Sequence, residues 1–406
     1  MERLVVVGAS LAGLRAVEAA RRLGYAGRIA LVGAEARPPY DRPPLSKSFL
    51  APDGPTDVAP LRSEHELAEL GVELLLGEPA EALDTVDRAV LVGGRAVRYD
   101  GLVIATGAAP RAFPGLGQLA GVHALRTRDD AVAVRQALDA GARTVVVGAG
   151  FIGSEVASAA RARGLPVTVV DAMALPLTRS VGSEVGTVCA DLHRAAGTDL
   201  RLGTGVAGVE SVEGRVTGVR LDSGELIAAE LVVVGVGVAP ATGWLEGSGL
   251  SLHARDRGVL CDATLWTGVP GVYAAGDVAH VVNPLFDGDL MRPEHWTNAA
   301  EQGAAAVKHL LDPAGARPLA SVPYFWSDWY SRRVQFVGTP QADEVLVARP
   351  AEDGFVALYR RADRVVGALT VDRPSDIMKL RRRIAERGSW VEAVTFVQDD
   401  LAAVPA

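Results

Sequence analysis

A strand–turn–helix pattern that occurs twice constrains the fold of this chain more than any other feature. In the first copy, RLVVVGASLAGLRAVEAARRLG, an expected strand at Leu4–Val7 runs into the turn Gly8-x-Ser10-x-x-Gly13 and then into a helix. This is the dinucleotide-binding fingerprint with serine at its second glycine position. Gly8 permits the sharp turn, Gly13 permits close helix–strand packing, and the helix N-terminus offers free N–H groups to a pyrophosphate. The next strand, RIALVGAE, ends at Glu35, roughly 20 residues on, where an acid that binds a ribose hydroxyl is expected.

The second copy repeats every part of the first. The segment ARTVVVGAGFIGSEVASAARARG holds Gly148-x-Gly150-x-x-Gly153 between an expected strand and an expected helix. The strand LPVTVVDA then ends at Asp171, again about where the ribose-binding acid is expected. One degenerate fingerprint is a weak signal, but two complete units in one chain predict two dinucleotide sites.

Asp171 indicates which nucleotide the second unit prefers. A carboxylate at this position would bind the ribose 2′-hydroxyl of NADH and repel the 2′-phosphate of NADPH. Ala172 follows it, so the adjacent position offers no arginine to that phosphate, although Arg179 could fold back toward it. The second unit therefore favours NADH, unless Asp171 merely caps its strand.

The segments between and after the two units indicate how the domains are arranged. An apolar strand that runs into a Gly/Pro turn follows each unit, as LVIATGAAPR and as LVVVGVGVAPAT. A later strand, VYAAGDVAH, contains Gly276-Asp277, and EHWTNAAEQGAAAVKHLL has a helical pattern. The C-terminal segments RVQFVGT, EVLVAR, GFVALYR and RVVGALTV alternate as strands do, which predicts an α+β domain. We expect an α/β protein with a discontinuous first domain (1–108 and 237–316), an inserted second domain (109–236) and a third domain (317–406).

Composition and charge exclude several classes of function. The net charge of −8 argues against general nucleic-acid binding. The two cysteines, Cys189 and Cys261, form no C-x-x-C or C-x4-C pair, which excludes a local redox dithiol, and an iron–sulfur cluster on this chain would need about four ligands. The start MERLVVVGAS runs directly into a strand pattern, and no apolar run reaches the roughly 18 residues of a membrane span. We expect a soluble, cytoplasmic protein, with no metal site and no catalytic triad.

Taken in order, the motifs resemble a known family. They are GxxxxG, PYDRPPLSK, ATG, GAGFIGSEVA, AAGD, WTNAAEQG and YFWSD. The chain is similar to FAD-dependent NADH:ferredoxin reductases of the putidaredoxin reductase-like family, which serve haem-thiolate monooxygenases and ring-hydroxylating dioxygenases. The resemblance implies a glutathione-reductase-like fold with FAD in the first domain and NADH in the second. It also implies a small [2Fe–2S] ferredoxin as partner.

The resemblance also implies which residues hold the cofactors. FAD contacts are expected at Gly8, Ala12, Gly13, Glu35, Lys47, Ala80, Arg126, Asp277 and Trp296. The wider cofactor-binding set adds Ser10, Thr106, Gly107, Gly148, Gly150, Ile152, Gly153, Glu155, Asp171 and Gly235. Asp277 should hold a flavin ribityl hydroxyl. Related proteins often carry an acid where Ala34 stands, and we expect Glu35 to take its role in binding the ribose.

Three residues are implied to act in electron transfer: Lys47, Glu155 and Trp326. Four prolines stiffen the stretch RPPYDRPPLSKSFL, because each ring fixes φ near −65°. On this interpretation the stretch holds Lys47 beside the flavin N5 and within reach of Glu155, although a solvated loop lysine is the simpler alternative. Trp326 should lie near the flavin and face the ferredoxin, or be an ordinary interface aromatic. Trp329 stands where related proteins often have glutamine, and we expect it to add apolar surface near the docking face.

The segment MKLRRRIAERG is a candidate docking surface for an acidic ferredoxin. Its basic residues are Lys379, Arg381, Arg382, Arg383 and Arg387, and a solvated helix face is the alternative. Other functions remain open: a flavin NADH oxidase, a rubredoxin-type reductase, or a slow-turnover flavoprotein with a binding or signalling role. The sequence leaves the oligomeric state open between a monomer and a homodimer.

Overall fold

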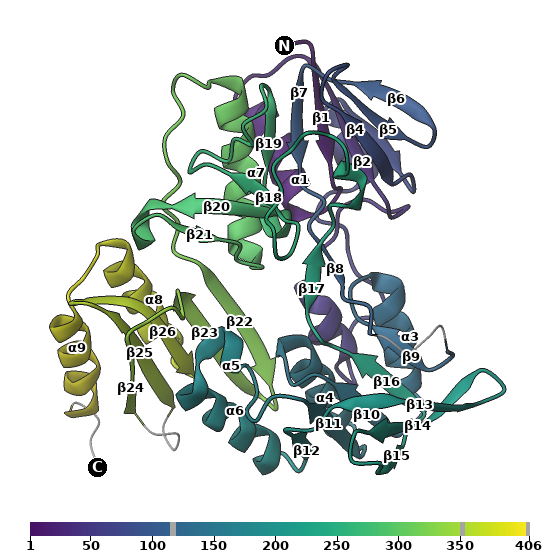
Figure 1. Ribbon diagram of the computed structural model, residues 1–406, viewed down its shortest axis with the longest axis vertical. Helices are drawn as coiled ribbons and strands as arrows, with labels where there is room; N and C mark the ends of the chain where they lie inside the picture. Colours follow the sequence, from purple (N-terminus) through teal and green to yellow (C-terminus); the bar gives the residue numbers. More distant parts are fainter. Residues whose placement is uncertain (114–118, 350–353, 403–406) are drawn as a thin grey trace. The chain divides into compact units, whose positions relative to one another are not determined.

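The computed structural model describes residues 1–113, 119–349 and 354–402, apart from the side chains of residues 179, 349 and 399–402. The chain forms two compact units (Figure 1). Unit 1 comprises Met1–Asp41, Ala59–Ala109 and Val238–Tyr324, and unit 2 comprises Arg42–Val58, Pro110–Gly237 and Phe325–Ala406. No helix in the described ranges is long and apolar enough to cross a membrane.

Unit 1 is organised around a five-stranded parallel sheet. In the order in which they pair, its strands are β19 (Val272–Ala274), β7 (Gly101–Ile104), β1 (Arg3–Val7), β2 (Arg28–Gly33) and β3 (Val72–Leu76). Most residues of the four strands from β19 to β2 are buried, as is typical of a parallel sheet covered on both faces. Helices α1 (Leu11–Arg22) and α7 (Trp296–Leu311) pack tightly together, since a Cβ on Gly303 would lie 2.1 Å from the Ala12 carbonyl oxygen.

Smaller elements complete unit 1. Two three-stranded sheets are formed by β4 (Ala80–Asp84), β5 (Ala89–Val92) and β6 (Arg95–Arg98), and by β18 (Val259–Cys261), β20 (Ala279–Asn283) and β21 (Asp289–Met291). The short helix α2 (Glu64–Glu69) begins with a capping box in which Ser63 and Glu66 bond each other's backbone N–H groups. Strand β8 (Ala108–Pro110) pairs with β17 (Val238–Pro240).

Unit 2 contains a second parallel sheet of the same design. In the order in which they pair, its strands are β12 (Asp199–Leu202), β11 (Val167–Asp171), β10 (Thr144–Val147), β16 (Leu231–Val234) and β9 (Val122–Ala124). Its helices are α3 (Arg128–Asp139), α4 (Phe151–Ala162), α5 (Thr178–Val181) and α6 (Ser183–Ala195). A three-stranded sheet, β13 (Val206–Val212), β14 (Arg215–Leu221) and β15 (Leu226–Ala228), accompanies it.

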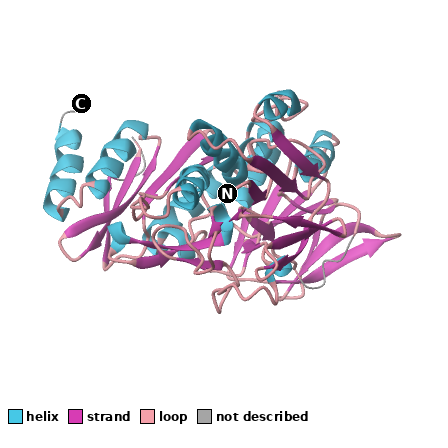
Figure 2. Ribbon diagram, turned by 90° about the horizontal axis from the view of Figure 1, so that it is seen from above, coloured by secondary structure: helices cyan, strands magenta, loops and turns pink. Residues whose placement is uncertain are grey.

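The C-terminal part of unit 2 is an antiparallel sheet with two helices. The strand order is β22 (Tyr324–Trp329), β23 (Arg332–Gly338), β26 (Arg364–Val371), β25 (Phe355–Arg361) and β24 (Glu344–Arg349). Helices α8 (Pro374–Ala385) and α9 (Trp390–Ala402) follow, and Figure 2 shows them side by side. The four strands predicted here from alternating sequence are present, and the two parallel sheets and this α+β part match the predicted fold class.

Candidate functional site

In unit 1, several of the predicted cofactor-binding residues lie at one edge of the parallel sheet. Gly8 follows β1, Glu35 follows β2, Thr106 follows β7 and Asp277 follows β19, so all four lie at carboxyl ends of parallel strands. The strand order reverses between β1 and β7, and ligands of open α/β sheets bind in the crevice at such a switch point. The chain thus brings these four residues to the edge where a dinucleotide is bound.

The turn after β1 requires glycine. Gly8 has a φ of +123°, and a Cβ there would lie 2.1 Å from the Ala105 carbonyl oxygen. A Cβ on Gly13 would lie 2.0 Å from the Gly8 carbonyl oxygen, so this glycine lets α1 approach the strand. Ser10 is the residue before the first turn of α1, and Ala12 is buried within that turn. The N–H groups of this helix N-terminus are placed to receive a pyrophosphate.

Four of the predicted unit 1 residues, Asp277, Thr106, Glu35 and Trp296, are held by specific hydrogen bonds. The Arg292 Nη1 atom donates to the Asp277 carbonyl oxygen at 2.9 Å. The Thr106 hydroxyl donates to the Ala241 carbonyl oxygen at 2.9 Å, the Glu35 carboxylate accepts from the Tyr40 hydroxyl at 2.6 Å, and the Trp296 indole donates to Asp41 at 2.7 Å. Gly107 adopts a φ of +68°, and Ala80 begins β4. The glycine cradle, the helix N-terminus and the acids at the strand ends fit FAD.

Unit 2 repeats this arrangement around its own switch point, between β10 and β16. Gly148 has a φ of +105°, and a Cβ there would lie 2.5 Å from the Gly235 carbonyl oxygen. A Cβ on Gly153 would lie 2.2 Å from the Gly148 carbonyl oxygen, so the same close approach of helix and turn recurs. Gly150 is the residue before α4, and Ile152 lies in its first turn. These residues fit a second dinucleotide.

The acid at the end of β11 faces the glycine turn. One oxygen of Asp171 accepts a hydrogen bond from the Ala149 N–H at 2.8 Å, and the other accepts from the Met173 N–H at 2.8 Å. Each carboxylate oxygen has more than one lone pair, so both can still accept from a ribose hydroxyl. The side chain of Arg179, the possible phosphate partner, lies outside what the structure describes.

The proline-rich stretch leads to a buried ion pair within unit 2. Its second half forms two short 3-10 turns, Pro43–Ser46 and Ser48–Leu50, with Phe49 and Leu50 buried as anchors. The Lys47 Nζ atom lies 2.8 Å from Glu155 Oε1, and the two side chains are 15% and 2% exposed. Lys47 is therefore not a solvated loop lysine. Its ammonium makes a single ion pair with the described part of the chain, which leaves N–H donors for a ligand.

Two serines that the sequence reasoning missed complete the surroundings of Glu155. The Ser46 hydroxyl donates to Oε2, and the Ser327 hydroxyl donates to Oε1. Each serine adjoins a residue that the motifs singled out, Lys47 and Trp326, so adjacency was the available signal. The expectation that Trp329 adds apolar surface is wrong: its side chain is fully buried, and its indole N–H donates to the Ser327 hydroxyl at 2.7 Å.

A second polar network joins the C-terminal sheet to helix α4. The Tyr330 hydroxyl lies 2.9 Å from the Thr198 hydroxyl and 2.7 Å from His193 Nδ1. The other ring nitrogen of His193 lies 3.1 Å from the Ser154 hydroxyl, which donates to the Gly150 carbonyl oxygen. Because the Ser154 proton is used there, His193 Nε2 is the donor and Nδ1 accepts from Tyr330. Burial lowers the pKa of His193 to about 4, so the ring is neutral near pH 7.

Trp326 and Arg126, two further predicted residues of unit 2, each make contacts with arginine residues. Trp326 is half-buried in β22, and the guanidinium of Arg333 lies 5.9 Å from the centre of its ring. Arg126 precedes α3, and its carbonyl oxygen accepts from Arg42 Nη1 at 2.7 Å.

The basic segment of the C-terminal domain is largely helical. Arg382 forms an exposed ion pair with Glu386 at 2.9 Å. Lys379 and Arg383 lie over the ring of Phe396 in α9, at 5.3 and 5.0 Å from its centre. Part of the positive charge is therefore engaged within the domain, whereas the Arg382 side chain is 80% exposed and can reach a partner.

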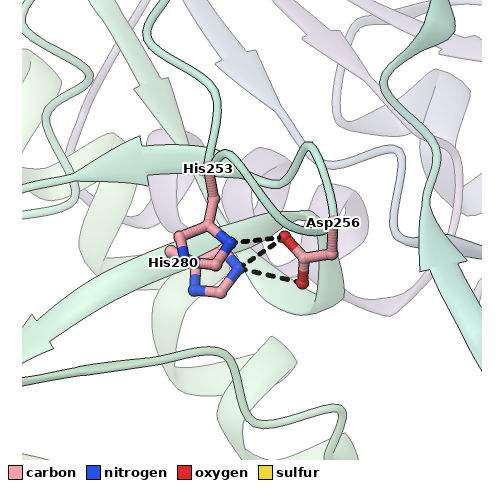
Figure 3. A group of neighbouring side chains, drawn as sticks. All are labelled: His253, Asp256 and His280. Atoms are coloured by element: carbon pink, nitrogen blue, oxygen red, sulfur yellow. Dashed lines mark hydrogen bonds and ion pairs between the residues drawn. The ribbon is translucent and has the colours of Figure 1, made fainter.

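Unit 1 also contains a cluster of two histidines and an acid, shown in Figure 3. Asp256 lies 3.0 Å from His253 Nδ1 and 2.9 Å from His280 Nε2, and the two rings stack with their centres 4.2 Å apart. Arg292 Nε donates to the same carboxylate at 3.0 Å, and the Gly258 N–H donates at 3.1 Å. Burial opposes ionisation of Asp256, but these donors and the positive charge of Arg292 hold its pKa below the usual range. Because the Arg292 guanidinium bonds the Asp256 carboxylate, the cluster is a hydrogen-bonded network that holds Arg292 in place. Arg292 in turn donates to the Asp277 carbonyl oxygen, so the network also supports the Asp277 backbone.

Comparison with known proteins identifies the family to which these two dinucleotide sites belong. Residues 2–303 match the family model described as pyridine nucleotide-disulphide oxidoreductase, and residues 324–402 match the one described as reductase C-terminal. The chain belongs to the pyridine nucleotide-disulphide oxidoreductase family. It is 36% identical to rhodocoxin reductase of Rhodococcus erythropolis, over 94% of this chain and 89% of that protein. It is 37% identical to the ferredoxin–NAD(+) reductase component of the p-cumate 2,3-dioxygenase system of Pseudomonas putida, over 96% of this chain and 94% of that protein.

A solved structure extends the likeness to the whole fold. The reductase of the covalent putidaredoxin reductase–putidaredoxin complex superposes with a TM-score of 0.90 at 32% identity, covering 99% of both chains. The predicted family, the glutathione-reductase-like fold class and the class of FAD-dependent oxidoreductase are thereby confirmed. Members of this pyridine nucleotide-disulphide oxidoreductase family use FAD and NAD(P)H.

The cysteines of this family member do not form a redox disulphide. Cys189 lies in α6 of unit 2 and Cys261 lies in β18 of unit 1, and both are buried and free. Burial raises the pKa of Cys189 to about 12, and burial together with the nearby charge of Asp262 raises that of Cys261 further. Neither thiol is ionised near neutral pH, so neither is a ready nucleophile.

Proposed function

We propose that this protein is an FAD-dependent NADH:ferredoxin reductase that supplies a monooxygenase or a dioxygenase through a [2Fe–2S] ferredoxin. The observation that carries the proposal is the presence of two dinucleotide cradles of one design in a single chain. Gly8 and Gly148 both have positive φ angles. Each lies close to a backbone carbonyl oxygen that follows the neighbouring strand at the switch point, Ala105 for Gly8 and Gly235 for Gly148. The similarity to ferredoxin reductases, over almost the whole chain, supports the choice of electron acceptor.

The domains divide this work as the sequence suggested. Residues 1–108 and 237–316 hold FAD, residues 109–236 hold NADH, and residues 317–406 contribute the docking surface for the ferredoxin. When bound, FAD allows one NADH and two oxidised ferredoxins to give NAD+, a proton and two reduced ferredoxins. The protein supplies binding, orientation and electrostatics, and no general base is needed.

Lys47 and Glu155 are the residues that set the charge near the reacting ring. Lys47 presents an ammonium whose remaining N–H donors can face a ligand, and an ammonium beside N5 favours the reduced ring electrostatically. Glu155 holds that ammonium in place at 2.8 Å, and the two serines hold Glu155. Trp326 shields the ring on the side from which electrons leave.

Asp171 makes the second site selective for NADH. Its carboxylate is fixed against the Ala149 N–H at the ribose end of the glycine turn. A 2′-phosphate placed there would meet a negative charge, whereas a 2′-hydroxyl would donate a hydrogen bond. Because NADH is a cytoplasmic reductant, we place the enzyme in the cytoplasm.

Stopped-flow mixing of the holoenzyme with NADH tests the proposal against its alternatives. Fast flavin reduction, followed by fast transfer to a [2Fe–2S] ferredoxin and slow reaction with oxygen, supports it. Fast reoxidation by oxygen would indicate an NADH oxidase, and preference for a rubredoxin would indicate that class of acceptor. Slow reduction with a long-lived nucleotide complex would indicate a binding or signalling flavoprotein.

A further inference from the structure

Both oxygens of the Glu155 carboxylate accept from partners within unit 2. Glu155 is 3% exposed, and its Oε1 accepts from both Lys47 and the Ser327 hydroxyl. Its Oε2 accepts from the Ser46 hydroxyl. A buried carboxylate needs such donors, because without them the free-energy cost of removing it from water is not compensated.

The direction of the bond between Ser327 and Glu155 is set by a neighbour. An indole N–H can only donate, and Trp329 Nε1 donates to the Ser327 hydroxyl oxygen at 2.7 Å. Ser327 must therefore accept from Trp329, and its own proton is directed to Glu155. Trp329 has little freedom to turn away, since it is fully buried and its ring centre lies 5.5 Å from that of His193 and 6.3 Å from that of Phe151.

We propose that Trp329 is a positioning residue which, through Ser327, sets the geometry and charge balance of the Glu155–Lys47 pair and so the rate of flavin reduction. While the Ser327 hydroxyl donates a hydrogen bond to Oε1, it offsets part of the negative charge of the carboxylate, so the Lys47 ammonium acts more strongly on a nearby ligand. Without this hydrogen bond, the ammonium interacts more fully with Glu155. This inference rests on the proposed function and adds a residue that does not touch the pair itself.

Two substitutions of Trp329 separate its hydrogen bond from its volume. Trp329→Phe keeps most of the aromatic volume and removes the N–H, whereas Trp329→Gln keeps an N–H donor and leaves a cavity. In single-turnover reduction at saturating NADH, we expect Trp329→Phe to be about threefold to tenfold slower than the native enzyme, the value of one hydrogen bond. We expect Trp329→Gln to be faster than Trp329→Phe although its thermal midpoint is lower.

Two further readouts distinguish positioning from packing. The flavin midpoint potential, measured by dye equilibration, should become more negative in Trp329→Phe, because Lys47 is then more fully neutralised. Ser327→Ala should reproduce the slow reduction, and adding Trp329→Phe to it should slow the reaction no further, since both act through one hydroxyl. As a matched control, Tyr359→Phe removes a buried donor to the Val181 carbonyl in the same sheet, and should lower stability without changing the rate.

The outcomes separate this inference from the proposed function. If Trp329→Phe is reduced as fast as the native enzyme, or if rates simply follow the thermal midpoints across the variants, Trp329 only fills space and the inference is overturned. Additive effects of Ser327→Ala and Trp329→Phe would overturn it as well. If the native holoenzyme itself is not reduced by NADH, the proposed function fails, and this inference fails with it.

Discussion

The ion pair between Lys47 and Glu155 should stabilise the fold as well as serve the reaction. At the 2.8 Å separation of Nζ and Oε1, their attraction is about 6 kcal/mol for an effective dielectric constant of roughly 20, and desolvation offsets most of it. Removing one partner leaves the other charge buried, which costs about 3–5 kcal/mol. The loss of unfolding free energy for Lys47→Met should lie at the upper end of this range, because the remaining Glu155 is almost inaccessible to water. The loss for Glu155→Gln should lie at the lower end, because the 15% exposed lysine can turn toward water.

A double-mutant cycle measures this coupling. Urea unfolding of the holoenzyme at a fixed excess of FAD, followed by fluorescence, gives the loss of unfolding free energy for each single variant and for Lys47→Met/Glu155→Gln. We expect the double variant to lose about 2–3 kcal/mol less than the two single losses together. The same variants should be reduced by NADH more slowly than the native enzyme, with Lys47→Met affected most. Additivity within about 0.5 kcal/mol would refute the reasoning, as would unchanged flavin reduction in Lys47→Met.

Three further predictions concern nucleotide choice, acid stability and docking. Asp171→Asn removes the charge at the ribose end of the glycine turn, so the NADH-to-NADPH ratio of kcat/KM should fall by about tenfold, equivalent to about 1.4 kcal/mol; an unchanged ratio would show that Asp171 only caps its strand. The pKa of His193 is lowered to about 4 from 6.5, so the unfolded chain binds the proton first as pH falls. The folded protein should therefore lose about 3 kcal/mol of unfolding free energy between pH 6.5 and pH 4. His193→Asn, which keeps an acceptor for Tyr330, should flatten the dependence of unfolding free energy on pH in that window, and an unchanged slope would contradict this assignment. Arg382→Glu should slow ferredoxin reduction and weaken its salt dependence, whereas Arg194→Glu, a similar helix-surface substitution, should do neither; equal effects would remove α8 from the docking surface.

The parts of the fold that sequence predicted are those governed by local rules. Gly8 and Gly148 were assigned to sharp turns because only glycine adopts such angles easily, and both have positive φ in the structure. The apolar strands β1, β2, β7, β10 and β16 each have a glycine at or next to one end, and the C-terminal strands alternate. Each of these signals is contained in a few consecutive residues.

The surroundings of Glu155 could not be predicted in the same way. Ser327 lies 172 residues from Glu155 in the sequence, and nothing local indicates that the two meet. The error over Trp329 has a simple cause: a departure from a family pattern does not say which side of a strand a residue faces. Ser327 and Trp329 are two residues apart in β22 and share its buried face, so the period of the strand was the signal that could have placed both.

The polar networks around His193 and Asp256 could not be predicted from the sequence for a related reason. Both depend on histidines that are scattered along the chain and acquire partners only through tertiary packing. His193 is set by Tyr330 from the C-terminal sheet, and His280 is set by Asp256 from a preceding turn. Residue type alone leaves such histidines indistinguishable from solvated ones.

Anaerobic stopped-flow reduction of the holoenzyme by NADH and NADPH, followed by mixing with a [2Fe–2S] ferredoxin, tests the central claim most directly. We predict that NADH bleaches the flavin in a single fast phase, that NADPH does so at least about tenfold more slowly, and that two ferredoxins are reduced per flavin. A flavin that NADH does not reduce would contradict the account, and so would a reduced enzyme that passes its electrons to oxygen but not to the ferredoxin.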